Sequence, residues 1–484
     1  MEPARRATGS RSLPIVLKKQ GNRTRLDPVE GRGSRNMESL MGNTKGTRMP
    51  KDVSTKQQRI ARLAQRHADR PFLSLNHYID IKWLREAYRR TRKDGAAGID
   101  GKTAQEYGER LDENLESLLS RAKSGSYRAP AVKRVHIPKG SGKGTRPIGV
   151  PTIEDKVMQR AVVMALEPIC EQYFLDCSYG FRPGRSPHQA LESLWKEIMS
   201  MGRCWMIEID IQSFFDTMDK AVLREIVKQR VSDGVINRLI GKWLKAGVME
   251  EGRIGYPEAG TPQGGVISPL LANMYLHDVL DEWFEETVKG HMKGKCFMIR
   301  FADDAILGFS MESDARKVLE VLPKRFAKYG LKLHPEKTRL VHFKPQGKDG
   351  ERPGTFDFLG FTHYWGKSRQ GHAVVKRKTA KDRLKRSMRK VYQWCKRNRH
   401  VKVKEQHRQL CLKLRGHYNY YGITGNLKML RTFYLEVKKT WIKWLGRRSQ
   451  KSYINWEKAE NLLSHYVLPP ARIYHSYCGS SAKP

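Results

Sequence analysis

The chain has 484 residues and is strongly basic, with 92 Lys and Arg against 50 Asp and Glu and a formal net charge of +42. Such an excess indicates a polyanionic partner, above all a phosphate backbone. The alternative is an anionic membrane surface, but the sequence has no apolar run of 18 residues and no secretory signal, so a soluble, cytoplasmic protein is expected. Its seven cysteines form no Cys-x-x-Cys pair, which argues against a zinc site or a disulfide framework.

The first part of the chain divides into a polar leader and a helical segment. Residues 1–55 are rich in Gly, Arg, Ser, Asn and Thr, so burial cannot offset their ordering entropy and we expect a disordered basic leader. It either contacts RNA or is a solvated tail. Apolar residues at helical spacing predict helices over residues 57–67 and 79–91. Residues 94–101 are turn-rich, and a P-loop fails there because Ala96 stands where that motif needs glycine.

Residues 132–150 predict two strands joined by a Gly-rich tip. Lys139 stands before the tip and Arg146 after it, so the two cations can hold a polyphosphate from both sides, or they are ordinary surface residues. Residues 178–186 combine aromatic and arginine side chains with Gly and Pro. This pattern suits stacking and phosphate contact with a nucleic acid, or a simple turn anchored by Tyr179 and Phe181.

Three carboxylates follow apolar segments with strand periodicity. Apolar and polar residues alternate over residues 205–211, which predicts a strand reaching Asp210. Asp303 and Asp304 lie between two short apolar runs and are expected at the turn of a β-hairpin. Adjacent anions with oxygen-only ligands suit Mg²⁺, and Asp210 can reach the same ion if its strand lies beside the hairpin. An Asp-Asp dipeptide is also ordinary turn chemistry.

Four blocks resemble, in order and spacing, the successive motifs of reverse transcriptases. They are residues 210–216, 260–269, 301–304 and 358–361. The resemblance is to group II intron reverse transcriptase/maturases and runs from about residue 93 to about residue 466. It implies an α+β right-hand polymerase with fingers, an antiparallel-sheet palm and a helical thumb, followed by a helical maturase domain. The implied divisions are a leader at 1–55, an N-terminal extension at 56–130, fingers and palm at 131–365, thumb and maturase at 366–470, and a tail at 471–484.

The resemblance also implies the chemistry and its residues. An RNA-directed DNA polymerase of this kind copies group II intron RNA from a DNA primer or target, using dNTP substrates and two Mg²⁺ ions. The implied metal ligands are Asp210, Asp303, Asp304 and the carbonyl of Ile211, and the implied nucleotide contacts are Lys139, Arg146, Gln263 and Gly264. Residues 356–361 resemble the primer grip.

Phe215 and Lys337 each have two interpretations, of which the first or both come from the resemblance, and Asp216 has an expected structural role. Phe215 would lie under the sugar and exclude a 2′-hydroxyl, or it is a core residue. Lys337 would protonate the leaving pyrophosphate or simply neutralise it. Asp216 is expected to cap a helix that starts near Lys220 rather than to bind metal.

The C-terminal part of the chain carries most of the charge imbalance. Residues 361–484 contain 30 Lys and Arg, 5 Asp and Glu, and five of the ten Trp. Helical spacing, as in Leu384, Met388, Val391 and Trp394, predicts a bundle with basic outer faces. Residues 415–422 resemble the thumb and maturase signature, so structured RNA is the expected partner and its binding should depend on salt. The individual Tyr and Trp side chains are expected in the core.

Two departures from the family pattern qualify the interpretation. Phe301 stands where most relatives have Tyr, which removes a hydroxyl but no metal ligand. No His/Cys endonuclease follows the maturase region, so target cleavage is not expected. Two other functions stay open: a splicing cofactor whose polymerase is secondary, and a domesticated relative in DNA repair or phage defence.

Overall fold

The computed structural model describes residues 51–138, 144–250, 252–256, 264–346, 353–449 and 454–476. Residues 1–50 of the predicted leader therefore lie outside the described residues, as do Lys139 and Gln263. The two helices predicted before residue 92 are confirmed as α2 (Lys51–Arg66) and α3 (Ile81–Arg90), although α2 begins earlier than expected. Two short helices follow, α4 (Ala104–Glu109) and α5 (Leu111–Ser124).

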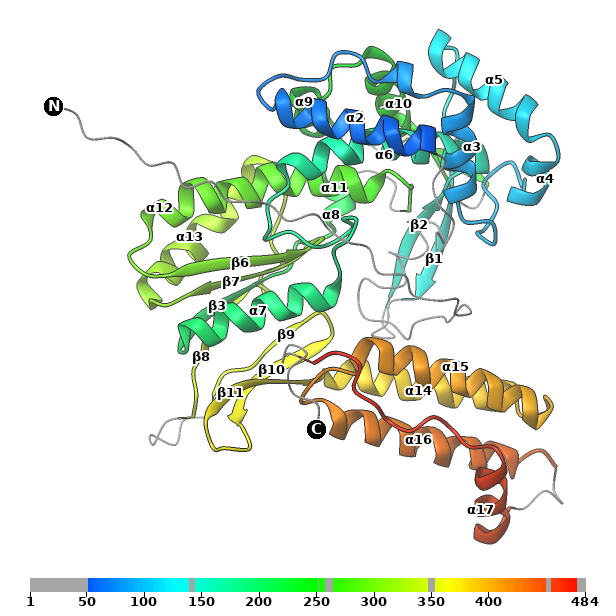
Figure 1. Ribbon diagram of the computed structural model, residues 1–484, viewed down its shortest axis with the longest axis vertical. Coiled ribbons are helices and arrows are strands. Elements are labelled where there is room, and N and C mark those ends of the chain that lie inside the picture. The colour runs from blue at the N-terminus through cyan, green and yellow to red at the C-terminus, as the bar shows by residue number, and fades with distance from the viewer. Residues whose placement is uncertain are drawn as a thin grey trace.

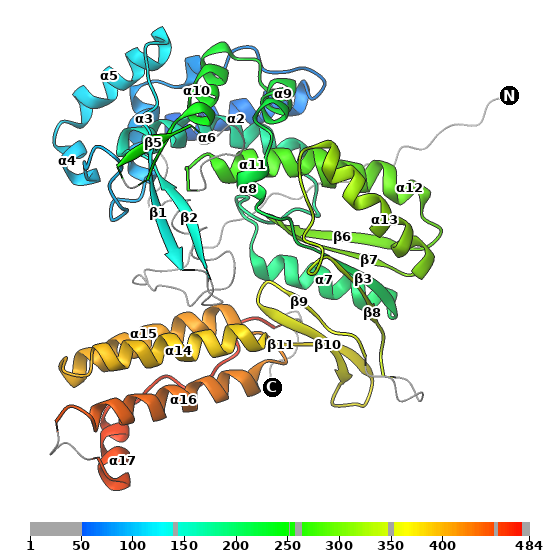
Figure 2. The same ribbon diagram turned by 180° about the vertical axis from the view of Figure 1, so that it is seen from behind.

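The first sheet contains the hairpin predicted over residues 132–150. Its strands, in the order β2-β1-β4-β5, are β2 (Thr145–Val150), β1 (Val132–Pro138), β4 (Val248–Glu250) and β5 (Arg253–Gly255). The hairpin projects from the helical part of the chain toward the C-terminal helices (Figures 1 and 2). Behind it, α6 (Ile153–Tyr173) is almost wholly buried and contacts α2 and α3, so these elements share one core.

The central sheet confirms the predicted strand and hairpin. It is antiparallel, in the order β6-β7-β3-β8, and its strands are β6 (Cys296–Phe301), β7 (Asp304–Phe309), β3 (Cys204–Ile209) and β8 (Arg339–Phe343). Helix α7 (Pro187–Met201) covers one face and α13 (Glu312–Lys328) the other (Figure 1). Strand side chains alternate between the two faces, so the sheet separates two hydrophobic clusters.

The helices between β3 and β6 correct one sequence prediction. They are α8 (Phe214–Thr217), α9 (Lys220–Arg230), α10 (Gly234–Lys245), α11 (Ser268–Leu276), wider π-helical segments at His277–Asp281 and Trp283–Val288, and α12 (Lys289–His291). The cap of α9 is Asp219, whose carboxylate accepts hydrogen bonds from the amides of Ala221 and Val222. The prediction for Asp216 is therefore wrong, because that residue already lies within α8.

The C-terminal part begins with a third sheet and continues as helices. The sheet has the order β11-β10-β9, with β9 (Phe356–Phe358), β10 (Phe361–Lys367) and β11 (Ala373–Thr379). The helices are α14 (Lys381–Arg397), α15 (Val403–Tyr421), α16 (Leu427–Leu445) and α17 (Trp456–His465). The helical spacing noted for Leu384 to Trp394 is thus confirmed in α14. Before it, β11 pairs with β10 over seven residues, so a strand precedes the predicted bundle.

The tyrosines of the C-terminal signature are buried, as expected, whereas Trp456 and Tyr474 are 78% and 46% exposed and the core prediction is wrong for them. Tyr418, Tyr420, Tyr421 and Trp441 are at most 7% exposed. They belong to a hydrophobic cluster that also contains residues of α7 and of the central sheet. The C-terminal helices and the α7 face of the sheet therefore share one core. Among the described residues, no helix is long and apolar enough to cross a membrane.

Candidate active site

The three predicted carboxylates lie at one end of the central sheet. Asp210 follows the last residue of β3, Asp303 is the second residue of the two-residue turn between β6 and β7, and Asp304 begins β7. Because Ile209 pairs with Ala305, extending the register by one residue brings Asp210 opposite Asp304. The Asp303 side chain is exposed, whereas Asp210 and Asp304 are half-buried. The three carboxylates therefore lie at the same end of adjacent strands, as the sequence predicts.

A buried arginine fixes the turn that carries Asp303. The Arg300 guanidinium is 0% exposed and donates to the carbonyl of Ala302 over 3.0 Å. It also donates to both carboxylate oxygens of Asp281 over 2.6 and 2.5 Å, to Asn273 Oδ1 over 2.9 Å and to Ser178 Oγ over 2.7 Å. These contacts occupy the planar donor fork of the guanidinium. The turn is thus held by partners from three distant segments.

The loop before α7 packs directly against the same turn. A Cβ atom on Gly180 would lie 2.2 Å from the amide nitrogen of Ala302, so only glycine fits at this close approach. The carbonyl of Gly180 accepts a 2.6 Å hydrogen bond from Asn273 Nδ2, and Ser178 pairs with Arg300 as an added parallel bridge. Residues 178–180 therefore form part of the support for the turn.

Arg182 and Tyr179 of this loop have structural roles. Arg182 is 3% exposed and donates to Glu171 over 3.0 Å and to the carbonyls of Leu175 and Ser178. Its donors are directed into the protein, so the phosphate-contact interpretation is wrong for Arg182. Tyr179 is buried and its hydroxyl contacts Ser193 over 2.7 Å. The simpler alternative, an anchored turn, therefore holds for these two side chains.

Lys337 is placed beside Asp210. Its Nζ atom lies 3.3 Å from Oδ2 and 3.4 Å from Oδ1 of that carboxylate. The two segments are joined by their backbones as well, because the amide of His334 donates to the carbonyl of Asp210 over 2.8 Å. The site thus contains a cation next to one of the three carboxylates, which offsets part of their negative charge at this end of the sheet.

The donor set fits a hard cation such as Mg²⁺. The candidate ligands Asp210, Asp303, Asp304 and the Ile211 carbonyl all offer oxygen. Within the described part of the chain, no three His, Cys, Asp or Glu side chains gather closely enough to hold a metal by themselves. Magnesium sites with one or two carboxylates are completed by water and substrate phosphates. The arrangement therefore fits a metal that binds together with a nucleotide.

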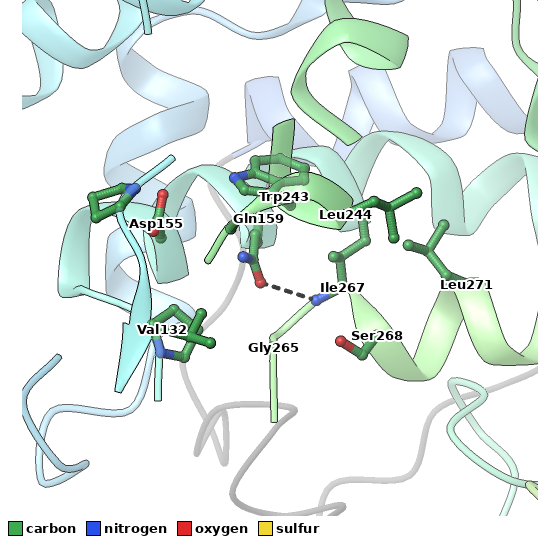
Figure 3. A pocket seen from close by; sticks show the side chains of 12 residues that line it. Val132, Asp155, Gln159, Trp243, Leu244, Gly265, Ile267, Ser268 and Leu271 are labelled. Atoms are coloured by element: carbon green, nitrogen blue, oxygen red, sulfur yellow. Dashed lines mark hydrogen bonds between the residues drawn. The ribbon is translucent and has the colours of Figure 1, made fainter. Parts of the chain in front are cut away.

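Gly264 lies against β2, where Arg146 is exposed. A Cβ atom on Gly264, whose φ is +120°, would lie 2.5 Å from the carbonyl oxygen of Gly149. The segment is held by Gln159 of α6, whose Oε1 accepts from the amide of Val266 over 2.8 Å and from the amide of Ile267 over 3.4 Å. Figure 3 shows the second of these bonds. Gln159 is 4% exposed. Sequence reasoning missed this residue because its partner is 107 positions away.

A small cavity of about 30 Å³ lies behind this segment, lined by Gln159, Trp243, Gly265 and Asp155 among others (Figure 3). Burial raises the pKa of Asp155 to about 8, and the hydroxyl of Tyr127 hydrogen-bonds to its carboxyl group. The space is large enough for a single water molecule, not for a nucleotide. The side chains that line the cavity, Gln159 among them, therefore support the Gly264 segment.

Phe215 follows Asp210 by five residues in the sequence and is partly buried against the hydrophobic core. Phe214 takes the buried position in α8 and is 3% exposed, whereas Phe215 is half-buried with its ring 5.2 Å from that of Phe214. Ser213, which precedes them, has a φ of +47°. The half-buried ring is compatible with both interpretations, so a role toward a sugar stays a prediction.

Four non-glycine residues in the described ranges have a left-handed backbone: Phe181, Ser213, Ala302 and Leu359, with φ between +47° and +58°. Such conformations cost free energy and persist only where the surroundings impose them, which is typical of functional sites. Ala302 lies in the turn with Asp303, Ser213 follows Asp210 by three residues, and Phe181 follows the supporting Gly180, so three of the four strained positions adjoin the carboxylate site.

Replacing Gln159 by alanine should raise the KM for dNTPs about tenfold, because the buried amide of Val266 loses its acceptor and the Gly264 segment loosens. Steady-state primer extension with varied dNTP measures this change. The matched control is Gln393→Ala, at an exposed position of α14. An unchanged dNTP KM in folded Gln159→Ala protein would contradict the assignment.

The comparisons with known proteins define first the class and then the family. The family described as "Reverse transcriptase (RNA-dependent DNA polymerase)" matches residues 137–363, which contain the whole candidate site. The chain therefore carries a reverse transcriptase domain in an α+β fold.

Three relatives extend this result. Protein YkfC of Escherichia coli strain K12 is 34% identical over 333 residues, which are 61% of this chain and 83% of that protein. Group II intron-encoded protein LtrA of Lactococcus lactis subsp. cremoris is 38% identical over 228 residues, 46% of this chain and 37% of LtrA. Nuclear intron maturase 2, mitochondrial, of Arabidopsis thaliana is 28% identical over 176 residues, 28% of this chain and 24% of that protein. The chain belongs to the group II intron-type reverse transcriptase/maturase family.

Proposed function

We propose that this reverse transcriptase copies group II intron RNA into cDNA at the end of the central sheet, and that its basic C-terminal helices bind the intron RNA and assist splicing. The observation that carries the proposal is the meeting of Asp210, Asp303 and Asp304 on adjacent strands above the buried Arg300. In this interpretation the first and central sheets belong to fingers and palm at 131–365, and the thumb and maturase region spans 366–470.

The reaction joins the primer 3′-oxygen to the α-phosphorus of a dNTP and releases pyrophosphate. Two Mg²⁺ ions held by Asp210, Asp303, Asp304 and the Ile211 carbonyl would supply the positive charge that favours the 3′-oxyanion and the leaving group. The contribution of the protein is positioning. Arg300 keeps the Asp303 turn in place, and Lys337 places a positive charge beside Asp210 that would protonate or neutralise the leaving pyrophosphate.

The nucleotide would be held between the β1–β2 hairpin and the Gly264 segment. Arg146 is exposed on β2, where it can pair with a triphosphate. Gly264 allows the backbone to lie close to β2, and Gln159 fixes the amides that follow. Phe215 would close the space beside the sugar. Lys139 and Gln263, outside the described residues, stay proposed contacts on the basis of the family motif alone.

RNA binding by the C-terminal helices would rest on charge and shape. Cations already cover aromatic faces on these helices: Lys413 lies over Trp394 at 5.3 Å, and Lys438 over Tyr434 at 5.4 Å. The tyrosines of the 415–422 signature are buried. The signature thus presents no tyrosine ring for base stacking, Trp456 and Tyr474 are the exposed Trp and Tyr rings of the described C-terminal part, and phosphate contacts with counterion release would dominate affinity.

The test separates polymerase from RNA binding without deleting the helices, because their core is continuous with that of the sheet. Lys381, Lys385 and Arg389 are exposed and spaced four residues apart along α14. Replacing all three by glutamine should weaken intron RNA binding and lower the slope of log K against log salt by roughly two to three. Extension of a short primer on an RNA template should be retained.

The matched control is the triple replacement of Lys317, Lys324 and Lys328 by glutamine on α13, which removes the same charge from outside the C-terminal helices. Equal loss of intron affinity in both variants would contradict a binding role for α14. Absence of primer extension by folded, RNA-binding wild-type protein would contradict the polymerase and favour a protein that only assists splicing.

A further inference from the structure

The tight turn between β9 and β10 has a backbone that its sequence does not favour. Phe358 pairs with Phe361, so Leu359 and Gly360 alone make the turn, with φ of +50° and +79°. Glycine adopts this region freely, but leucine does so only under constraint. A two-residue hairpin turn of this kind requires a positive φ at both residues, so the hairpin itself imposes the strain on Leu359, and a contact to its carbonyl would stabilise that conformation further.

Tyr420 of α15 makes that contact. Its hydroxyl donates a 2.9 Å hydrogen bond to the carbonyl of Leu359, and its ring lies 5.9 Å from the ring of Phe361 with an interplanar angle of 22°. The Tyr420 side chain is in the hydrophobic core, and the residue is 7% exposed. The carbonyl of Gly360 is held separately, by the amide of Ala380 over 3.0 Å. In the part of the chain that the structure describes, the Tyr420 hydroxyl is thus the donor that holds the carbonyl of Leu359.

Tyr420 is also joined to the half of the protein that carries the carboxylates. His188 of α7 donates from Nε2 to the carbonyl of Tyr420 over 2.8 Å. Burial and the neighbouring His475 lower the pKa of His188 to about 4, so the ring is neutral and the proton on Nε2 makes this bond. Phe301, which directly precedes the Ala302–Asp303 turn, belongs to the same hydrophobic cluster as Tyr420 and Leu359, so the two turns rest on one core.

We propose that Tyr420 is a positioning residue that fixes the Leu359–Gly360 turn relative to the Asp303–Asp304 turn, and so couples the C-terminal helices to the placement of the primer 3′ end. This inference rests on the proposed function and on the resemblance of residues 356–361 to the primer grip of the family. A hydroxyl on a maturase-region helix then aligns the primer for nucleotidyl transfer. Small displacements of a reacting end have large effects on rate.

The experiment compares two isosteric substitutions in the same helix. Tyr420→Phe removes the hydroxyl that holds Leu359, and Tyr418→Phe removes a hydroxyl that donates to the carbonyl of Pro469 over 3.2 Å. We expect kcat for primer extension to fall about tenfold in Tyr420→Phe, with the dNTP KM and the intron RNA Kd unchanged. Tyr418→Phe should keep the wild-type kcat. Wild-type kcat in Tyr420→Phe, or an equal loss in Tyr418→Phe, would overturn the proposal.

A second readout keeps the inference independent of the polymerase assignment. Amide hydrogen exchange in the peptide spanning residues 356–362 should accelerate at least fivefold in Tyr420→Phe and stay unchanged in Tyr418→Phe. If wild-type protein extends no primer, the proposed function fails, yet this measurement still decides whether Tyr420 fixes the turn. Unchanged exchange in both variants would overturn the positioning role.

Discussion

Replacing Asp303 by asparagine should reduce primer extension by at least about a hundredfold while leaving the free energy of unfolding close to that of wild type. The substitution keeps the size of the side chain and removes the charge that would hold the metal, and losses of this order follow when one electrostatic group is removed from an active site. Stability should be retained because Asp303 is exposed in the turn. Single-turnover extension and urea unfolding measure the two quantities.

The control for this experiment is Asp216→Asn. Asp216 is an exposed carboxylate in α8, near Asp210 in sequence, and the structure assigns it neither a capping nor a ligand role. Its variant should extend primers at the wild-type rate. Substantial extension by Asp303→Asn would show that the chemistry does not depend on this carboxylate.

Replacing Arg300 by methionine should lower the free energy of unfolding by about 3–5 kcal/mol, because it leaves the carboxylate of Asp281 buried without its partner. Activity should fall as well, since the Ala302 carbonyl loses its donor. For comparison, Arg85→Met breaks an exposed pair with Asp112 and should change stability by less than about 1 kcal/mol. Urea unfolding measures both variants.

The double variant Arg300→Met, Asp281→Leu separates stability from function. Removing both charges from the core should restore much of the lost stability, because buried ion pairs often exchange for apolar residues at little cost. Primer extension should stay impaired, because the apolar pair cannot hold the turn that carries Asp303. Recovery of activity together with stability would show that the Arg300 bond to Ala302 is dispensable.

The parts of the site that the sequence predicts are those fixed by local rules. Alternation with period two places the strand before Asp210, and a two-residue turn between apolar runs places Asp303. The sequence therefore brings the carboxylates together on the condition that the strand lies beside the hairpin. In the structure, β3 pairs directly with that hairpin.

The parts that escaped prediction depend on long-range contacts. Arg300 takes its partners from Ser178, Asn273 and Asp281, and no local pattern links these positions. The phosphate-contact prediction for Arg182 was wrong for the same reason. The sequence does not distinguish an arginine that donates to nearby carbonyls from an arginine that binds a phosphate. The N-cap of α9 is Asp219 rather than the predicted Asp216, because Asp216 lies within the preceding short helix α8.

The single core shared by α7, the central sheet and the C-terminal helices limits how this family can diverge. If α14 binds intron RNA as proposed, a descendant without an intron would no longer need its exposed positive charges, which can be replaced one at a time. The buried side of the same helices would have to stay, because the α7 face of the central sheet would otherwise expose apolar side chains to water. Such proteins would keep the C-terminal helices as structural support and would lose the basic surface first.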